Sequence, residues 1–223
     1  FDASGDLVAN APHVPVHLGS MSASVKSILR ENAGAIAPGD VFMMNDPFDG
    51  GTHLPDVTVI TPVFDAGGQA IQFLVASRGH HADIGGKTPG SAPPDSRHID
   101  EEGVLIKNFK LVSGGRLLET ETRALLASGS YPCRNIDNNI ADLTAQIAAN
   151  ATGSAELQRA VAHFGADVVQ SYMQHVQDNA EESVRRVIDV LEDSAFTYPL
   201  DSGASIKVAI SVDRASRRAT VDF

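Results

Sequence analysis

Cysteine is almost absent from this chain, since Cys133 is the single one among 223 residues. One cysteine excludes an intrachain disulfide, and this scarcity fits the reducing cytosol. Long apolar runs are also lacking: none approaches the ~18–20 residues that a membrane-spanning helix needs, and we find no secretory signal. We therefore expect a cytoplasmic protein with no membrane partner, in which Cys133 is a buried, unreactive thiol.

Clusters of basic residues are missing as well. The net charge is -11, with 17 Lys and Arg against 28 Asp and Glu. Binding to nucleic-acid phosphates requires Lys/Arg patches, and the longest basic stretch, Arg214 to Arg218, is typical of a turn between two strands. The sequence thus argues against a nucleic-acid partner.

Two catalytic signatures are absent. No GxxxxGK[ST] phosphate-binding loop occurs, and the segment Gly85-Gly86-Lys87-Thr88 lacks the upstream glycine that such a loop requires. No serine lies in a GxSxG turn, so an ordinary serine hydrolase has no support. We therefore expect neither a nucleotide-binding fold nor a serine nucleophile in this chain.

Apolar sequence is plentiful, because 43% of the residues are hydrophobic, which is enough for a substantial core. Short apolar runs bounded by turn residues predict strands over 41–44, 57–64, 71–77, 206–212 and 218–223. Periodic apolar positions predict helices over 21–31, 120–127, 138–149, 154–164 and 167–191. Gly153 and Gly165 read as breaks between the last three helices.

The order of these elements predicts an α+β fold: a mixed β-sheet in the N-terminal half, a helical segment at about 135–192 and further C-terminal strands. The composition changes near residues 130–135, so we predict a mixed α/β region over 1–134 and a helical segment with strands over 135–223. The chain begins with Phe1 rather than Met and ends inside a predicted strand at Phe223. We therefore expect a fragment of a longer polypeptide.

The most informative feature is a pair of glycine-rich motifs, GGTHLPD at residues 50–56 and RGHHADIGG at residues 78–86. Each places a His and an Asp three residues apart, His53 with Asp56 and His80 with Asp83. Two predicted strands separate the motifs, and in an antiparallel hairpin both motifs lie at the same end. Two or three His with one or two carboxylates are the usual ligands of Zn, Fe or Mn. The spacing therefore predicts one shared metal site.

Each member of this set also has an ordinary interpretation, in which Asp56 caps a turn and the histidines are surface or loop residues. Adjacent residues of an extended chain point in opposite directions, so we do not expect His80 and His81 to ligate the same ion. The second histidine would orient substrate or move a proton. Asp83 is either a further ligand or a carboxylate that holds an imidazole tautomer.

Other candidate side chains lie near the motifs in sequence. His13 and His17 could line the same cleft, although a structural role is favoured for each. Asp40, Asp46 and Asp49 add carboxylates, for which turn formation and solvation are the simpler interpretation.

Seven ordered segments resemble the hydantoinase B/oxoprolinase family and together cover residues 1–150. They are FDASG (1–5), HVPVHLGSM (13–21), PGDV (38–41), NDPF (45–48), GGTHLPD (50–56), HHADIGG (80–86) and DLTAQIAA (142–149). Members of this family are subunits or domains of ATP-dependent enzymes that open hydantoins, 5-oxoproline or lactams. Relatives carboxylate ketones such as acetone and acetophenone.

The resemblance implies a division of labour between two chains. A separate A-type subunit binds ATP and phosphorylates the substrate, while the B-type chain, which this sequence resembles, holds a divalent metal (Zn, Fe or Mn) and completes the reaction. The resemblance therefore implies a hetero-oligomer that acts on a small molecule. A metal-activated water would attack the phosphorylated carbonyl group.

The resemblance also implies roles for particular residues. The implied metal ligands are His53, Asp56, His80 and Asp2. The implied catalytic groups, which contact substrate or move a proton, are His81 and Asp83. We thus expect the metal-dependent subunit of a cyclic-amide hydrolase, with a ketone carboxylase subunit and a non-catalytic, metal-stabilised scaffold as alternatives. A structural zinc site is usually closed and often contains cysteine, so the single Cys133 favours an open catalytic site.

Overall fold

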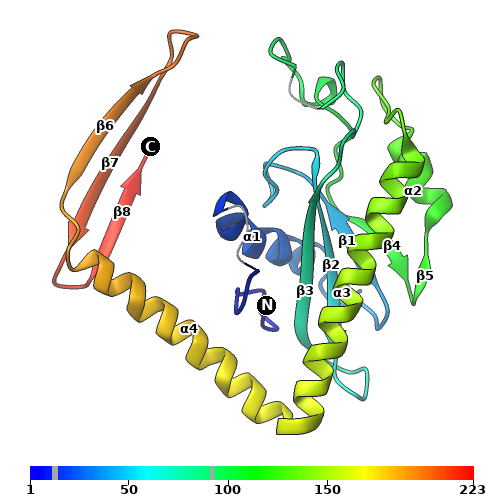
Figure 1. Cartoon of the computed structure of the whole chain (residues 1–223), viewed down its shortest axis with the longest axis horizontal. Coiled ribbons are helices and arrows are strands. Elements are labelled where there is room, and N and C mark those ends of the chain that lie inside the picture. The colour runs from blue at the N-terminus through cyan, green and yellow to red at the C-terminus, as the bar shows by residue number, and fades with distance from the viewer. Residues whose placement is uncertain (12–14, 91–92) are drawn as a thin grey trace. The chain divides into compact units, whose positions relative to one another are not determined.

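The computed structural model describes residues 1–11, 15–90 and 93–223, and these residues form helices and two antiparallel sheets (Figure 1). The α+β class predicted from the sequence is therefore confirmed. The chain divides into two compact units, Phe1–Gln170 and Ser171–Phe223. The predicted division into a metal-site region over 1–134 and a helical segment with strands over 135–223 stays a prediction.

The first unit is built on a five-stranded antiparallel sheet in the order β3-β2-β1-β4-β5. The strands are β1 (Val41–Met44), β2 (Asp56–Phe64), β3 (Ile71–His80), β4 (Phe109–Ser113) and β5 (Arg116–Leu117). β2 and β3 form the hairpin expected from the sequence. They pair from Phe64 with Ile71 beside the turn to Asp56 with His80 at the open end.

Helices cover both faces of this sheet (Figure 1). They are α1 (Pro15–Glu31), α2 (Glu119–Leu126) and α3 (Ile136–Phe164), with a 3₁₀ turn η1 (Ile99–Glu101). Val25 and Ile28 of α1 share a core cluster with Phe42, whereas Met43 clusters with Leu143 of α3. Because both faces are covered, β1 and most of β2 are buried at consecutive positions.

α3 differs from the prediction, because it continues through Gly153 as one helix of 29 residues. Gly153 lies where α3 meets β3, and a Cβ atom there would come within 3.1 Å of Cγ1 of Val75. The glycine thus allows a close approach of helix and strand and is not a break. Gly165, with a φ of 87°, does end the helix, as predicted.

The second unit contains the C-terminal part of α4 (Ala166–Ile188) and a three-stranded antiparallel sheet in the order β6-β7-β8. The strands are β6 (Ser194–Pro199), β7 (Ser205–Asp213) and β8 (Arg218–Asp222). Arg217, in the turn before β8, forms ion pairs of 3.1 Å with Glu182 of α4 and with Asp189, the residue that follows α4.

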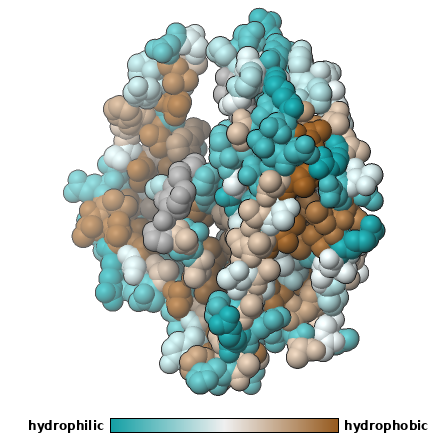
Figure 2. Space-filling view, turned by 45° about the vertical axis from the view of Figure 1, so that its right-hand side comes forward, coloured by the Kyte–Doolittle hydropathy of each residue, from teal (hydrophilic) through white to brown (hydrophobic). Residues whose placement is uncertain are grey.

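Apolar side chains remain at the surface of the second unit, where no residue from Ser171 to Phe223 is buried. Phe196 and Tyr198 of β6, for example, are 64% and 58% exposed. Figure 2 shows brown, hydrophobic areas on the surface of the protein. No helix among the described residues has both the length and the apolar character that a membrane crossing requires.

Candidate metal centre

A cluster of ligand-type side chains lies at the open end of the β2–β3 hairpin. Asp56 begins β2, His80 ends β3, and the two are direct partners in the antiparallel ladder. His53 precedes Asp56 by a tight turn, in which the N–H of Asp56 donates to the carbonyl of His53 at 3.0 Å. Directly opposed residues have Cβ atoms about 4.5–5.5 Å apart. The hairpin and the turn therefore bring His53, Asp56 and His80 together.

Asp56 is the centre of this cluster. Its Oδ2 lies 2.8 Å from Nδ1 of His53 and its Oδ1 lies 3.1 Å from Nδ1 of His80. One ligand-type atom of each residue lies within 4.8 Å of those of the other two. Donor atoms around a tetrahedral cation with bonds of ~2.0–2.1 Å are roughly 3.3 Å apart. The three side chains therefore fit a single divalent cation with small shifts.

The cluster is buried on one side and open on the other. The Asp56 side chain is 4% exposed, whereas those of His53 and His80 are 45% and 57% exposed. Burial alone would raise the pKa of Asp56, but the hydrogen bonds from Thr52 and His80 and the charge of His53 outweigh it. The pKa of Asp56 therefore lies below its ordinary value. An ionised carboxylate at the base and two exposed imidazoles leave room for water or substrate.

His17, in the first turn of α1, adds an imidazole beside the cluster. Its Nδ1 lies 3.8 Å from Oδ2 of Asp56 and 3.4 Å from Nη1 of Arg78. The sequence favours a structural role for His17, whereas the structure brings its ring to the edge of the candidate centre. His13, the other histidine expected near this cleft, lies outside the described residues.

His81 points away from the cluster toward α3 and is 2% exposed. Its Nε2 lies 3.3 Å from Oε1 of Gln146, and its Nδ1 lies 3.0 Å from Nδ2 of Asn139. Both amide nitrogens also donate to backbone carbonyls, of Val57 and Asp83 respectively, which fixes the amide atom that faces the ring. His81 is therefore a neutral imidazole with its proton on Nε2, and burial lowers its pKa.

Asp83 connects the loop that follows β3 to the segment that precedes α3. Its Oδ1 accepts from Nη1 of Arg134 at 2.6 Å, and its Oδ2 accepts from the backbone N–H of Arg134 at 2.7 Å. The carboxylate is only 15% exposed. In these contacts Asp83 ties the second motif to the segment before α3.

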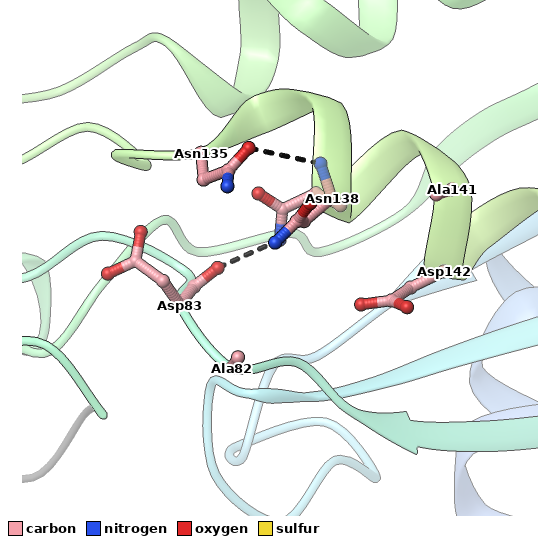
Figure 3. A pocket seen from close by; sticks show the side chains of 7 residues that line it. Ala82, Asp83, Asn135, Asn138, Ala141 and Asp142 are labelled. Carbon is pink, nitrogen blue, oxygen red and sulfur yellow. Dashed lines mark hydrogen bonds between the residues drawn. The ribbon is translucent and has the colours of Figure 1, made fainter.

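A pocket of about 280 Å³ lies where this loop meets the first turns of α3 (Figure 3). It is lined by Ala82, Asp83, Asn135, Asn138, Asn139, Ala141 and Asp142. Figure 3 shows Asp83 and Asp142 at different sides of the pocket, and Asp142 reaches within 4.0 Å of Nδ1 of His81. Five of the seven lining residues carry an amide or a carboxylate, so the pocket offers several polar groups.

Asp2, expected from the family resemblance to be a fourth ligand, lies elsewhere. It forms an isolated bridge with Phe73 of β3, seven residues before His80, which corresponds to roughly 23 Å along a strand. Its Oδ1 accepts from the N–H groups of Ser4 and Asp6. The carboxylate closes the N-terminal turn, and the structure does not bring it to the cluster.

The sequence predicts no role for three polar residues at this end of the hairpin, Arg78 beside the cluster and Asn139 and Gln146 beside His81. Arg78 could have been found, because it lies two residues before His80 and so on the same face of the strand. Gln146 lies in the segment DLTAQIAA that resembles the family, but the contacts of Asn139 and Gln146 with His81 span 58 and 65 residues of sequence, so local spacing does not predict them.

A comparison with known proteins extends over the whole chain. A family model described as hydantoinase B/oxoprolinase matches residues 1–223. The 5-oxoprolinase of Dictyostelium discoideum is 43% identical over 232 residues, which cover 100% of this chain but 18% of that relative. The chain thus spans about a fifth of the length of this curated relative.

The solved structures that are similar to this one include a caprolactamase and an acetone carboxylase. The ATP-dependent caprolactamase from Pseudomonas jessenii has a TM-score of 0.80 and 27% identity, over 93% of this chain and 36% of that chain. A nucleotide-free acetone carboxylase has a TM-score of 0.76 over 100% of this chain and 32% of that chain, and its 17% identity shows the fold alone. With the family model matched from the first residue to the last, this chain belongs to the hydantoinase B/oxoprolinase family.

Proposed function

We propose that this chain holds a catalytic divalent cation, Zn, Fe or Mn, for the ATP-dependent opening of a cyclic amide. The substrate class is that of 5-oxoproline, hydantoins and lactams. The observation that carries the proposal is the convergence of His53, Asp56 and His80, with ligand-type atoms within 4.8 Å of one another. Relatives named 5-oxoprolinase and ATP-dependent caprolactamase support the reaction type.

The residues of the cluster have distinct tasks in this proposal. A cation bound there would act as a Lewis acid toward a carbonyl or water oxygen. Asp56 supplies the negative charge at the buried base, and Thr52 holds its Oδ2 through a hydrogen bond of 2.7 Å. His53 and His80 face the solvent side, from which substrate can approach. Proton transfer by His81 or Asp83 stays a prediction. In the structure His81 bonds to Asn139 and Gln146, and Asp83 bonds to Arg134.

The proposal needs ATP to be bound outside the described centre. Amide resonance makes a cyclic amide a poor electrophile, and phosphorylation of its carbonyl oxygen would create a leaving group. The sequence has no P-loop. We therefore propose an A-type ATP-binding part, either a partner subunit in a hetero-oligomer or another region of a longer polypeptide. The second arrangement fits a relative of which this chain covers 18%.

The identities to known relatives favour cyclic-amide hydrolysis over ketone carboxylation as the reaction. The 43% identical relative is named a 5-oxoprolinase, whereas the likeness to acetone carboxylase rests on 17% identity and concerns the fold.

The test combines the chain with an A-type ATP-binding subunit and measures bound metal, ADP release and ring opening with 5-oxoproline, hydantoin and a lactam. We expect ring opening that requires both ATP and the metal. His53→Ala should abolish it, whereas the control His98→Ala, at an exposed loop histidine, should not. Full ring opening by H53A would exclude the proposal, and turnover of a ketone with bicarbonate instead would redirect it to the carboxylases.

A further inference from the structure

Arg78 lies directly beside the cluster on the same face of the hairpin. It precedes His80 by two residues in β3, and its partner in β2 is Thr58, which follows Asp56 by two residues. Side chains two residues apart in a strand share a face. Arg78 and Thr58 are therefore the next pair on the same face of the ladder, two positions from the pair that would hold the cation.

The guanidinium of Arg78 donates to three separate segments. Nε donates to Oγ1 of Thr58 in β2 at 2.7 Å. Nη1 donates to Oγ of Ser20 at 2.5 Å and Nη2 to Oγ of Ser24 at 2.8 Å, both in α1. Nη2 also lies 3.4 Å from the carbonyl oxygen of Gly50, in the loop of residues 45–55. One side chain thus joins β2, α1 and this loop, which is called the Gly50 loop below.

The Gly50 loop is packed backbone to backbone against α1. Gly50 has a φ of 93°, and a Cβ atom there would lie 2.6 Å from the backbone of Ala23 and Ser24. The hydroxyl of Ser24, which accepts from Arg78, also donates to the Gly50 carbonyl. Arg78 and Ser24 therefore hold the loop and the helix as one layer over the hairpin.

The partners of Arg78 indicate a geometric task. They are hydroxyl and carbonyl oxygens, with Nδ1 of His17 at 3.4 Å. Burial lowers the pKa of the Arg78 guanidinium, and the negative charge of Asp56 acts in the opposite direction. A planar fork with five N–H donors can serve several neutral acceptors at once, which a lysine ammonium cannot do in the same geometry.

We propose that Arg78 is a positioning residue of the metal centre. It holds α1 and the Gly50 loop against the hairpin end, so that His17 and His53 stand beside Asp56. The inference rests on the proposed function, because it assumes that the cluster binds a cation. It goes beyond that function by naming the side chain that assembles the centre from three segments of the chain.

The test compares Arg78→Lys with Arg123→Lys in the complete chain. Arg123 is the control, because it lies on α2, bonds to Glu119 of the same helix and joins α2 to Asp137 of α3, away from the cluster. Zn²⁺ affinity is measured by competition with a chelator, and amide hydrogen exchange is measured without metal. We expect R78K to bind Zn²⁺ about 10–100-fold more weakly, as for other changes to groups that orient ligands. Exchange should become faster in residues 17–24 and 50–54 and stay unchanged in α3.

The outcomes separate this inference from the proposed function. Failure of the wild-type chain to bind Zn²⁺ would overturn both. Tight binding by the wild type and equal binding by R78K would overturn the inference alone. Faster exchange throughout the first unit of R78K, α3 included, would show a general structural role and would overturn it too. R123K should match the wild type in affinity and in the exchange of both segments.

Discussion

His80 and His81 are neighbours in the sequence, yet they belong to different environments. His80 exposes 57% of its side chain and faces Asp56, whereas His81 exposes 2% and bonds to two amides of α3. The alternation of the extended chain sends the two rings to opposite sides. The difference teaches that the partners on each side of the hairpin, and not the residue type, decide whether a histidine is available as a ligand.

The side that faces α3 is held by a series of amide side chains. Nε2 of Gln146 donates to the carbonyls of Val57 and Ser77 at 3.0 and 3.2 Å. One helical turn later, Nδ2 of Asn150 donates to the carbonyl of Val59 at 3.0 Å. These directional bonds fix how α3 lies along the hairpin, which apolar contacts alone would leave less specific. The α3 side therefore stabilises the hairpin end, whereas the α1 side leaves the imidazoles of His53 and His80 exposed to solvent.

The largest effect should come from the shared carboxylate of the open side. Asp56→Ala removes the carboxylate that both exposed imidazoles face, His53 at Oδ2 and His80 at Oδ1, and with it the negative charge of the cluster. We expect Zn²⁺ affinity to fall by more than the roughly 100-fold seen when an outer group is lost. Chelator competition measures this. A loss of less than about tenfold, or ~1.4 kcal/mol, would mean that the cluster is not the binding site.

The two neighbouring histidines should separate affinity from stability. His81→Ala leaves a cavity and removes the hydrogen bonds that the amides of Asn139 and Gln146 make to the ring. The free energy of unfolding should therefore drop by about 2–4 kcal/mol, with Zn²⁺ binding retained. His80→Ala should lose Zn²⁺ binding and change stability by less than about 0.5 kcal/mol. Urea unfolding and metal titration of both variants check this, and His81→Gln serves if H81A does not fold. Equal changes in Zn²⁺ affinity and in the free energy of unfolding for both variants would contradict the distinction between the two histidines.

A buried carboxylate away from the cluster, that of Asp40, allows a smaller test. Asp40 is 2% exposed and pairs with Nζ of Lys110 at 2.7 Å. Burial works to raise its pKa, but hydrogen bonds from Lys110 and from the N–H groups of Gly114 and Ala37 lower it below the ordinary value. The pKa of Asp40 is lower in the folded chain than in the unfolded chain, so the unfolded chain binds the proton first as the pH falls. The stabilisation by the Asp40 carboxylate is therefore complete above about pH 4. It is lost as the pH falls through the folded pKa.

Asp40→Asn should therefore lower the free energy of unfolding by about 1–3 kcal/mol at pH 7 and by less at pH 3. Zn²⁺ affinity should not change, since Asp40 contacts no residue of the cluster in the described contacts. Urea unfolding at the two pH values measures the difference. Equal losses at pH 7 and pH 3 would contradict the role assigned to Asp40.

The sequence predicted the features that depend on local spacing. Alternating apolar runs and the turn at 65–68 located the hairpin, and hairpin geometry then placed His53 and Asp56 near His80. Features that depend on distant contacts were not predictable. Gly153 reads as a helix break until Val75 of β3 is seen beside it, and Arg134, the partner of Asp83, lies 51 residues away in the sequence.

The most direct test follows the imidazole nitrogens of the wild-type chain by ¹⁵N NMR during a Zn²⁺ titration. We predict that the Nδ1 signals of His53 and His80 move to positions typical of a metal-bound nitrogen, while the signals of His81 keep the neutral, Nε2-protonated pattern. Unchanged signals of His53 and His80 at saturating Zn²⁺, or a metal-bound signal from His81, would contradict the account.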